Sequence, residues 1–388
     1  MRLAIISDCL HVQTPQGIAG SDVHIFVRQM EALSKYFSEV HICCPFISYN
    51  ASVAITTYSN NKIFFIPLEK VGGAGIKAKI QLLKQFPAWI KAFKKANSLT
   101  DIVYQRFPNN LNIPGFFYFY CIRKKVFATY TGTWLKNNEE SFTYTFQKWL
   151  LKHFFKGPVG VYNHEPSTFK HVFNSFSPSY SEVEWQEETQ QVQNKIEQLQ
   201  LLPTVPLTMV TVGSFVGYKN QQYILNTCLK LQQNNIPYYL YMVGDGELMS
   251  PYKDFVAINK MQHQVTFTGK LTFTEVRKIY RAVNFVVQSP LVEGFGKVPI
   301  EGYFHGALPL INDIAMSSYI TQKNTLGYLF TVNNEDGLYN LLIDLKDKPL
   351  QVADRVQQAR LFAKQFTLEA WANEYYQQIL LHYPQLNA

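Results

Sequence analysis

The chain of 388 residues is long enough for two or three hydrophobic cores, and its 47% content of hydrophobic residues excludes wholesale disorder. Its five cysteines include no C-x-x-C pair, which argues against a disulfide framework or a zinc site and favours a reducing, cytoplasmic setting. The net charge is +8, and the densest apolar run, IPGFFYFYCI (113–122), is far too short to span a bilayer.

Short apolar strands alternate with amphipathic helices through the first half, which is typical of parallel α/β sheets. Helices are expected at 22–37 and 76–97, and the loop before the first of them carries Gly17 and Gly20. Helix N-termini behind glycines are natural anion sites, so this loop is a candidate anion-binding turn. The expected strands are RLAIIS (2–7), EVHICC (39–44), KIFFIP (62–67), DIVYQR (101–106) and KKVFATY (124–130).

The second half repeats this alternation after a polar segment, residues 176–206, that we interpret as the end of the first domain, a polar helix and a linker. Each half is therefore expected to form its own doubly wound sheet, in which ligands bind at the carboxyl ends of the strands. The expected strands are LTMVTVG (207–213), YYLYMVG (238–244), QVTFTG (264–269), VNFVVQS (283–289) and ALPLIN (307–312).

Two turns of the second half follow strand ends and could face an anion. In VTVGSFVGYKN (210–220), Lys219 stands at the end of a glycine-containing turn, where it either reaches a ligand at the sheet edge or is a solvated loop lysine. In MVGDGELM (242–249), Gly244 and Gly246 allow close backbone approach, although such a turn suits many folds.

The run QSPLVEGFGKVPIEGYFHG (288–306) places two glutamates around a Gly-Phe-Gly turn. Pro299 suits the first turn of a helix, which puts Glu301 in that turn and Glu293 in the loop before it. Such a loop aims backbone N–H groups into a crevice beside a helix start that carries positive partial charge. Taken alone, the same pattern fits a loop whose acids merely cap a helix.

Other chemistries find little support in the sequence. The G-x-G-x-x-G fingerprint is absent, which disfavours a nicotinamide enzyme, and the nine histidines show no metal-ligand spacing. No metal, no cofactor and no nucleic-acid partner are expected. His24 is expected to be a packing or surface histidine rather than a catalyst.

The positive charge is concentrated in one part of the chain, because residues 70–156 hold 15 basic and three acidic side chains. The helix at 76–97 places Ile80, Leu83, Phe86, Ile90 and Phe93 near one face among lysines, with Pro87 expected to kink or split it. Residues 142–157 likewise mix lysines with Trp149, Phe154 and Phe155. These stripes either pack on the sheet of the first domain or rest on an anionic membrane surface.

Taken together in this order and spacing, these motifs resemble the large retaining glycosyltransferase family four, of GT-B fold. SPLVEGFGKVPIEGYFHGALPLI is similar to the family signature, VGSFVGYKN to its phosphate-binding turn, and VGDGE to its next strand and turn. VTFTGKLTFTEVRKIYRAVNFVV resembles the segment near the nucleotide base, GIAGSDVH the glycine loop of the acceptor domain, and residues 366–383 the last helix. The resemblance is strong over 207–331 and loose before 200.

The resemblance implies two Rossmann-like doubly wound domains facing a central cleft. We expect an acceptor domain at 1–203, a nucleotide-sugar-binding domain at 204–366, and a C-terminal helix, 367–388, that packs back on the first domain. Lys219 and Glu293 are implied to be catalytic, with Glu293 bonding the donor sugar and Glu301 the ribose hydroxyls. The implied donor-binding residues are Gly20, Ser214, Lys219, Gly244, Lys270, Glu293, Gly294, Phe295, Gly296, Lys297 and Glu301.

One position departs from the family pattern. The family usually has an arginine directly after the strand end at 213, whereas this chain has Ser214, which leaves Lys219 as the matched cation. Lys297, or Arg106 of the first domain, is a candidate to compensate. The acceptor-side His or Asp of the family has no clear counterpart, and TYTGTW (129–134) offers only hydroxyls and Gly132 there.

The implied activity is transfer of a sugar from a nucleotide-diphosphate sugar to a hydroxyl acceptor, with retention and without a metal. A carbohydrate or lipid-linked sugar acceptor fits, in cell-surface polysaccharide, lipopolysaccharide, capsule or glycolipid synthesis, at a cytoplasmic location on the inner face of the membrane. Two alternatives stay open because fold does not fix chemistry. One is a sugar-nucleotide epimerase or phosphorylase on the same scaffold; the other is a catalytically silent, membrane-associated scaffold.

Overall fold

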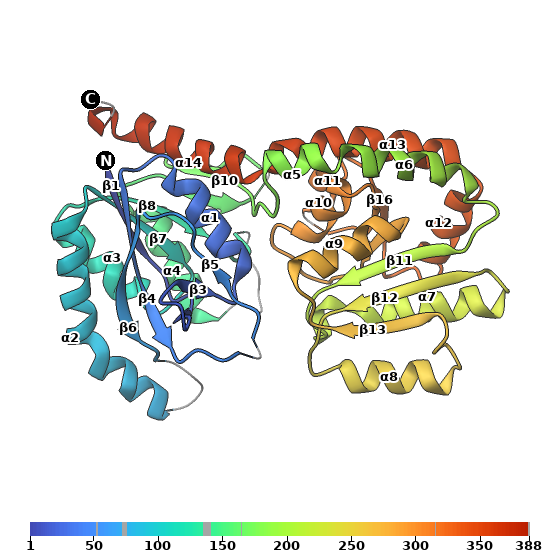
Figure 1. Ribbon diagram of the computed structural model, residues 1–388, viewed down its shortest axis with the longest axis horizontal. Helices are drawn as coiled ribbons and strands as arrows, with labels where there is room; N and C mark the ends of the chain where they lie inside the picture. Colours follow the sequence, from blue (N-terminus) through green and yellow to red (C-terminus); the bar gives the residue numbers. More distant parts are fainter. Residues whose placement is uncertain (52, 72–75, 135–140, 164, 315, 387–388) are drawn as a thin grey trace. The chain divides into compact units, whose positions relative to one another are not determined.

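The computed structural model describes all residues except 52, 72–75, 135–140, 164, 315 and 387–388, and it describes residues 76–83 by their backbone only. The chain forms two compact units. Unit 1 comprises residues 1–178 and 368–388, and unit 2 comprises residues 179–367. Each unit is an α/β structure built on one sheet, and Figure 1 shows the elements of both.

Within the described residues, the sheet of unit 1 has the order β10-β9-β8-β7-β1-β4-β2-β3-β5, with β6 also paired to β4. The pairs are parallel except β2–β3 and β3–β5. The strands are β1 (Arg2–Ile6), β2 (His11–Gln13), β3 (Ala19–Ser21), β4 (Glu39–Ile47), β5 (Thr56–Thr57), β6 (Ile63–Glu69), β7 (Ile102–Phe107), β8 (Lys125–Tyr130), β9 (Val159–Tyr162) and β10 (Val172–Ser175). All five strands expected in this half are present, and the short β2, β3 and β5 and the later β9 and β10 were not predicted.

Helices cover both faces of this sheet. They are α1 (His24–Ser34), α2 (Ile76–Leu99), α3 (Asn112–Cys121), α4 (Phe142–His153) and α14 (Leu368–His382). Side chains alternate along each strand, so in β1 Leu3 joins a core cluster with α1 and α14, whereas Ala4 joins a second cluster with α2, α3 and α4. Pro87 does not split α2, which is assigned as one helix. The side chains of Ile80 and Leu83 lie outside the described part.

Unit 2 is a parallel sheet of the order β13-β12-β11-β14-β15-β16. Its strands are β11 (Leu207–Val212), β12 (Tyr238–Val243), β13 (Val265–Gly269), β14 (Phe285–Gln288), β15 (Leu308–Asn312) and β16 (Tyr328–Phe330). Its helices are α5 (Glu182–Glu187), α6 (Thr189–Gln198), α7 (Gln221–Gln233), α8 (Met249–Ile258), α9 (Phe273–Ala282), α10 (Lys297–Phe304), α11 (Ser317–Ile320), α12 (Gly337–Lys346) and α13 (Pro349–Ala363). The five expected strands are present; β16 was not expected.

The division between the units lies at 178/179, earlier in the chain than the expected 203/204. The reason is that α5 and α6 pack on unit 2. Glu188, between these two helices, accepts hydrogen bonds from Arg277 Nη2 at 2.7 Å and from Arg281 Nε at 2.9 Å, both on α9. The C-terminal helix α14 belongs to unit 1, where it lies against α1 (Figure 1).

Candidate active site

The loops that carry the predicted donor residues lie along one edge of the unit 2 sheet. β11 pairs in parallel with β12 on one side and β14 on the other, so the carboxyl ends of these strands are neighbours. Figure 1 shows the arrowheads of β11 and β12 at the same edge. The loop after β11 contains Ser214 and Lys219, and the loop after β14 contains Glu293. Gly244 follows β12, and Lys270 follows β13. The sheet order therefore brings together sequence segments about 75 residues apart.

Hydrogen bonds join the loops after β11 and β14. Ser289 Oγ donates to the carbonyl oxygen of Asn220 at 2.7 Å, and the Leu291 N–H donates to the carbonyl oxygen of Tyr218 at 2.8 Å. Asn220 itself adopts a left-handed backbone with φ of 51° immediately before α7. These contacts fix the short 3-10 turn Gly217–Lys219 beside the loop that enters α10.

The two residues predicted to be catalytic contact each other. Lys219 Nζ forms an ion pair with Glu293 Oε2, and the two side chains are 17% and 27% exposed. The pair is thus partly accessible, so a ligand can reach both groups. The ammonium of Lys219 also lies 5.6 Å from the ring centroid of Tyr218. The sequence predicted both residues at the site but not their direct pairing.

The Gly-Phe-Gly turn leads into the N-terminus of α10. Gly296 precedes α10 with φ of 69°, a left-handed conformation that favours glycine, and a side chain on Gly294 would meet no atom within 4 Å. The ring of Phe295 is buried against Phe366, with centroids 5.6 Å apart, so it anchors the turn. The free N–H groups of the first turn of α10 give this end of the helix positive partial charge.

Glu301 differs from expectation in position and surroundings. It is the fifth residue of α10, beyond the first turn, because the helix begins at Lys297 rather than near Pro299. Its carboxylate is largely buried and accepts a hydrogen bond on each oxygen, from Ser179 Oγ at 2.5 Å and from Tyr280 OH at 2.8 Å. Each oxygen keeps a second acceptor position. Lys297 Nζ lies 3.9 Å from Glu301 Oε1 and is the more exposed partner.

Sequence reasoning missed Ser179 and Tyr280. Burial, and then the charge of Glu301, raise the pKa of Tyr280 well above its ordinary value, so the hydroxyl stays protonated and donates a hydrogen bond to the carboxylate. A tyrosine near the end of α9 carries no sequence signal that distinguishes it from a core tyrosine. Ser179 is 122 residues away from Glu301 in the chain, and only the fold brings the two together.

The glycine turn after β12 has a packing role. Gly244 has φ of 136°, and a Cβ atom there would lie 1.9 Å from the carbonyl oxygen of Gly213. The turns after β11 and β12 therefore approach each other by backbone contact that only glycine permits. Ser214 and Lys270 are exposed at this edge.

The predicted residues of unit 1 are held by contacts within that unit. Gly20 is not in a turn before a helix but in β3, where a Cβ atom would lie 2.6 Å from the carbonyl oxygen of Thr56. The guanidinium of Arg106 donates to Gln29 Oε1 at 2.9 Å and lies 5.0 Å from the ring centroid of Phe26. Gly132 lies against the ring of Tyr130. Close packing in the sheet thus explains Gly20 without a ligand.

Among the described residues, no group of three or more His, Cys, Asp or Glu side chains is arranged to hold a metal ion. In the same part of the chain, no helix combines the length and the apolar composition needed to cross a bilayer.

Comparison with known proteins finds similarity to glycosyltransferases. Residues 192–362, which lie inside unit 2, match the family glycosyl transferases group 1. An uncharacterized glycosyltransferase of Methanocaldococcus jannaschii is 25% identical over 158 residues, which is 41% of this chain and 43% of that protein. The chain thus aligns with less than half of the length of this curated relative.

Solved structures resemble the chain over nearly its whole length. A glycosyltransferase from Rickettsia africae covers 98% of both chains with a TM-score of 0.67 at 13% identity. Anabaena HepE, solved in complex with UDP-glucose, covers 98% of this chain and 99% of its own with a TM-score of 0.70 at 12% identity. WaaG, a glycosyltransferase involved in lipopolysaccharide biosynthesis, covers 98% and 99% with a TM-score of 0.66 at 12% identity. The chain has the GT-B fold, and residues 192–362 of its second unit match the glycosyl transferases of group 1.

Proposed function

We propose that the protein transfers a sugar from a nucleoside-diphosphate sugar to a hydroxyl group of an acceptor, with retention at the anomeric carbon. The observation that carries the proposal is the partly exposed Lys219–Glu293 pair beside the N-terminus of α10. A cation, free backbone N–H groups and a carboxylate meet there, which are the groups that a diphosphate and a sugar require.

Binding of the donor would rearrange this pair. The diphosphate competes with Glu293 for the ammonium of Lys219, and the released carboxylate accepts hydrogen bonds from hydroxyls of the donor sugar. In the reaction, the bond between the anomeric carbon and the diphosphate oxygen breaks. The acceptor oxygen forms its bond on the same face, and its proton passes to the departing diphosphate. Lys219 and the N–H groups of α10 stabilise the charge that develops on the diphosphate.

The relatives support a choice of first substrates. HepE has been solved with UDP and with UDP-glucose, so UDP-sugars are the first donors to test. WaaG acts in lipopolysaccharide biosynthesis, which suggests a carbohydrate or lipid-linked sugar acceptor in cell-surface polysaccharide, capsule or glycolipid synthesis. Glu301, on the same helix as Lys297, would bind the ribose hydroxyls through the acceptor positions that Ser179 and Tyr280 leave open.

We propose that the transfer needs no divalent ion, because Lys219 and the helix N-terminus supply positive charge where the diphosphate leaves. Activity should therefore survive an excess of chelator. Complete loss of transfer that magnesium or manganese restores would contradict metal independence and leave the donor site itself in place.

The basic surface of unit 1 supports attachment to the inner face of the membrane. Lys91, Lys94 and Lys95 are exposed on α2, and each basic residue near an anionic leaflet contributes about 1 kcal/mol. Co-sedimentation should require anionic vesicles, weaken as salt rises, and fall when these three lysines become glutamate. Equal binding to neutral vesicles, or binding to neither kind, would favour a soluble acceptor.

The decisive experiment incubates the protein with a panel of nucleoside-diphosphate sugars and candidate acceptors and measures the released nucleoside diphosphate. Release that depends on the acceptor, with a retained anomeric configuration in the product, is the expected result. A changed sugar nucleotide without release of nucleoside diphosphate would indicate an epimerase. Release that requires inorganic phosphate would indicate a phosphorylase. Donor binding without turnover across the panel would indicate a catalytically silent scaffold.

A further inference from the structure

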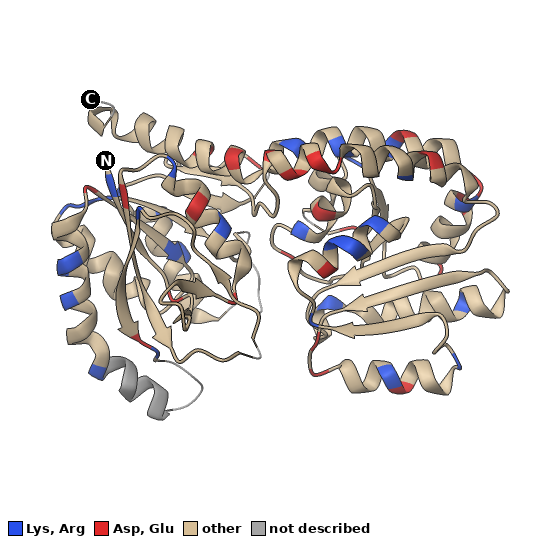
Figure 2. Ribbon diagram, viewed as in Figure 1, with Lys and Arg blue, Asp and Glu red and all other residues tan. Residues whose placement is uncertain are grey.

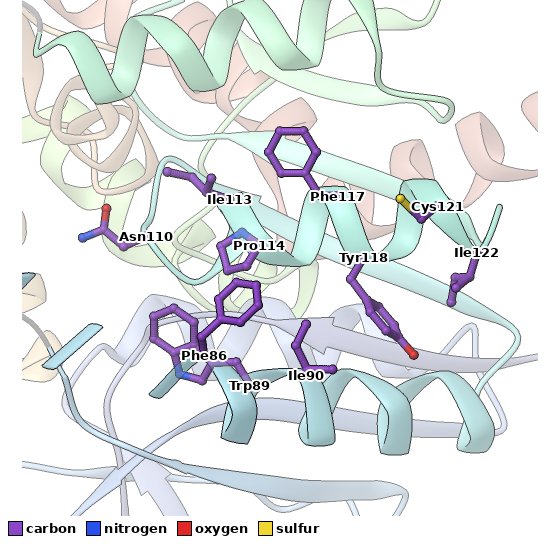
Figure 3. Close-up of a pocket in the computed structure, with 10 residues that line it drawn as sticks. All are labelled: Phe86, Trp89, Ile90, Asn110, Ile113, Pro114, Phe117, Tyr118, Cys121 and Ile122. Atoms are coloured by element: carbon purple, nitrogen blue, oxygen red, sulfur yellow. The ribbon is translucent and has the colours of Figure 1, made fainter. Parts of the chain in front are cut away.

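A pocket of about 750 Å³ lies between α2 and α3 in unit 1, whereas the candidate active site belongs to unit 2. Figure 3 shows Phe86, Trp89 and Ile90 of α2 lying opposite Pro114 and Tyr118 of α3. Nearly all of the lining side chains are apolar or aromatic. The volume falls within the roughly 300–1,000 Å³ range of pockets that hold small organic ligands.

The rim of this pocket is exposed and apolar. Phe86 and Phe117 are 48% and 47% exposed, and Ile122 is 43% exposed. Single exposed apolar residues need no explanation, but three of them surround one apolar hollow here. Covering this surface would lower the free energy, because it removes apolar area from water. The pocket therefore calls for an apolar ligand.

A second pocket, of about 610 Å³, lies at the C-terminal end of α3 and is basic. Arg123, Lys125 and Lys156 line it, and Arg123 and Lys156 are exposed. Lys124 also lines it, but its ammonium donates to the carbonyl oxygens of Asn97 and Thr100. No acidic residue is among the described residues that line this pocket. It therefore offers several positive charges to an anion.

Cys121, the last residue of α3, lines both pockets, so the two pockets adjoin at the end of this helix. An elongated molecule with an apolar chain and an anionic group would reach both by passing the last turn of α3. The sequence around them is uniformly non-acidic, because residues 76–99 and 112–125 contain no Asp or Glu. Figure 2 shows this for the described part of α2, where basic residues occur without acidic ones.

We propose that the two pockets form a binding site for one anionic phospholipid of a membrane leaflet. One acyl chain lies between α2 and α3, and the phosphate binds Arg123, Lys125 and Lys156. An acidic protein surface would satisfy the basic pocket but leave the apolar one empty, and a free nucleotide would do the same. A phospholipid matches both chemistries, and combined apolar and basic contacts give firmer membrane attachment than either alone.

The test uses soluble short-chain lipids, so that a discrete site is distinguished from general adhesion to a charged surface. Isothermal titration of the full-length protein with monomeric dihexanoyl phosphatidic acid should show saturable binding of one lipid per chain. Dihexanoyl phosphatidylcholine, with the same chains and no net charge, should bind at least tenfold more weakly. Glycerol 3-phosphate, which has no chain, should also bind at least tenfold more weakly.

Two variants test the two pockets separately. Phe117→Asp should weaken binding of dihexanoyl phosphatidic acid at least tenfold, because it disrupts the contact with the acyl chain. Arg123→Glu should weaken binding at least tenfold as well, because it removes a contact with the phosphate. The matched controls are Phe64→Asp, at a similarly exposed phenylalanine on β6, and Lys253→Glu, at an exposed lysine on α8. Circular dichroism verifies that all four variants fold.

The controls should leave the affinity unchanged. Any of three results would overturn the proposal. They are equal affinity for the two lipids, an affinity for glycerol 3-phosphate equal to that for dihexanoyl phosphatidic acid, and unchanged binding in both Phe117→Asp and Arg123→Glu. In addition, saturating lipid should slow maleimide labelling of the exposed Cys121 thiol, and labelling at an unchanged rate would place the lipid elsewhere.

Discussion

At the scale of single residues, Lys219 and Glu293 neutralise each other at the proposed donor site. Each group satisfies the other until a ligand arrives, so neither charge is left without a partner in a partly buried place. Under the proposed function, a sugar diphosphate would replace both partners at once, with its phosphates at Lys219 and its sugar hydroxyls at Glu293. A ligand that offers only one of these groups would leave the other charge unpaired.

Lys219→Ala should lower kcat at least tenfold, which is about 1.4 kcal/mol of transition-state stabilisation. The reason is that charge on the diphosphate grows as it leaves, and Ser214 supplies no second cation. Steady-state kinetics measure the effect, with Lys253→Ala on α8 as a control that should retain full activity. A loss smaller than tenfold in a folded Lys219→Ala protein would mean that another cation, such as Lys297, holds the phosphates.

Glu301→Ala should weaken binding of the donor nucleotide by about 1.5–3 kcal/mol, the range for a hydrogen bond to a charged group. Calorimetric titration with the productive nucleoside diphosphate is the measurement. Tyr280→Phe keeps the carboxylate but removes one of its two donors, so its effect should be in the same direction and smaller. Unchanged affinity in folded Glu301→Ala would remove this carboxylate from the nucleotide site.

At the scale of elements, a buried charged network attaches α5 and α6 to the rest of unit 2. The Glu188 carboxylate is 1% exposed and pairs with Arg277 and Arg281 of α9 and with His305 Nδ1, which lies 3.0 Å from Glu188 Oε2. Burial alone would raise the pKa of Glu188, but hydrogen bonds, first from His305 and then from Arg281, hold it well below its usual range. Burial lowers the pKa of His305, against the opposing effect of Glu188.

These two shifts predict that unit 2 loses stability in acid. The pKa of His305 in the folded protein is lowered from the ordinary value of 6.5. The unfolded chain therefore binds the proton more readily, and stability falls as pH drops below about 6.5. The stabilisation from Glu188 is complete above its unfolded value of 4.5 and is lost as pH falls below it toward the depressed pKa. Urea unfolding at pH 7, 5.5 and 4 measures the decline.

Glu188→Gln should be less stable than the natural protein at pH 7 by about 1.5–3 kcal/mol, the range for hydrogen bonds to a charged group, because Arg277 keeps its pair with Glu184 and Arg281 is 40% exposed. Its stability should also change less between pH 5 and 4. The exposed Glu335→Gln is the matched control and should follow the natural protein at each pH. A decline of the same steepness in Glu188→Gln would assign the acid sensitivity to other groups.

The sequence predicted elements better than contacts. Continuous apolar strands between amphipathic helices gave all ten expected strands, because parallel strands buried on both faces carry a strong local signal. Very short strands such as β3 and β5 carry little of this signal, so the sequence places Gly20 in a turn although it lies in the sheet. The positions of Lys219 and Glu293 followed from strand ends, but their pairing depends on β11 and β14 being neighbours, which no local pattern encodes.

At the scale of the whole molecule, the chain leaves unit 1 at 178 and returns at 368. The return is built into the core of unit 1. Trp371 and Tyr375 of α14 are 1% exposed, and Tyr375 OH lies 2.5 Å from Thr129 Oγ1, which in turn lies 2.6 Å from Tyr104 OH. Gly160 on β9 makes room for this tyrosine, because a Cβ atom there would lie 2.1 Å from its hydroxyl. The last helix is therefore a structural part of unit 1 rather than an appendage.

This arrangement predicts that a substitution in the core face of α14 destabilises unit 1, which also contains the N-terminal residues. Trp371→Ala removes a large buried side chain from the cluster that α14 forms with α1 and β1, which costs about 3–5 kcal/mol. Hydrogen exchange followed by peptide mass spectrometry should show faster exchange in β1 and β7 and unchanged exchange in β11 and β14. Leu381→Ala, at a 76% exposed position of the same helix, should leave both units unchanged. Trp371 packs in a cluster with β1, so its removal must speed exchange in unit 1 if α14 stabilises that unit. Faster exchange confined to unit 2, or unchanged exchange in β1, would mean that α14 does not stabilise unit 1.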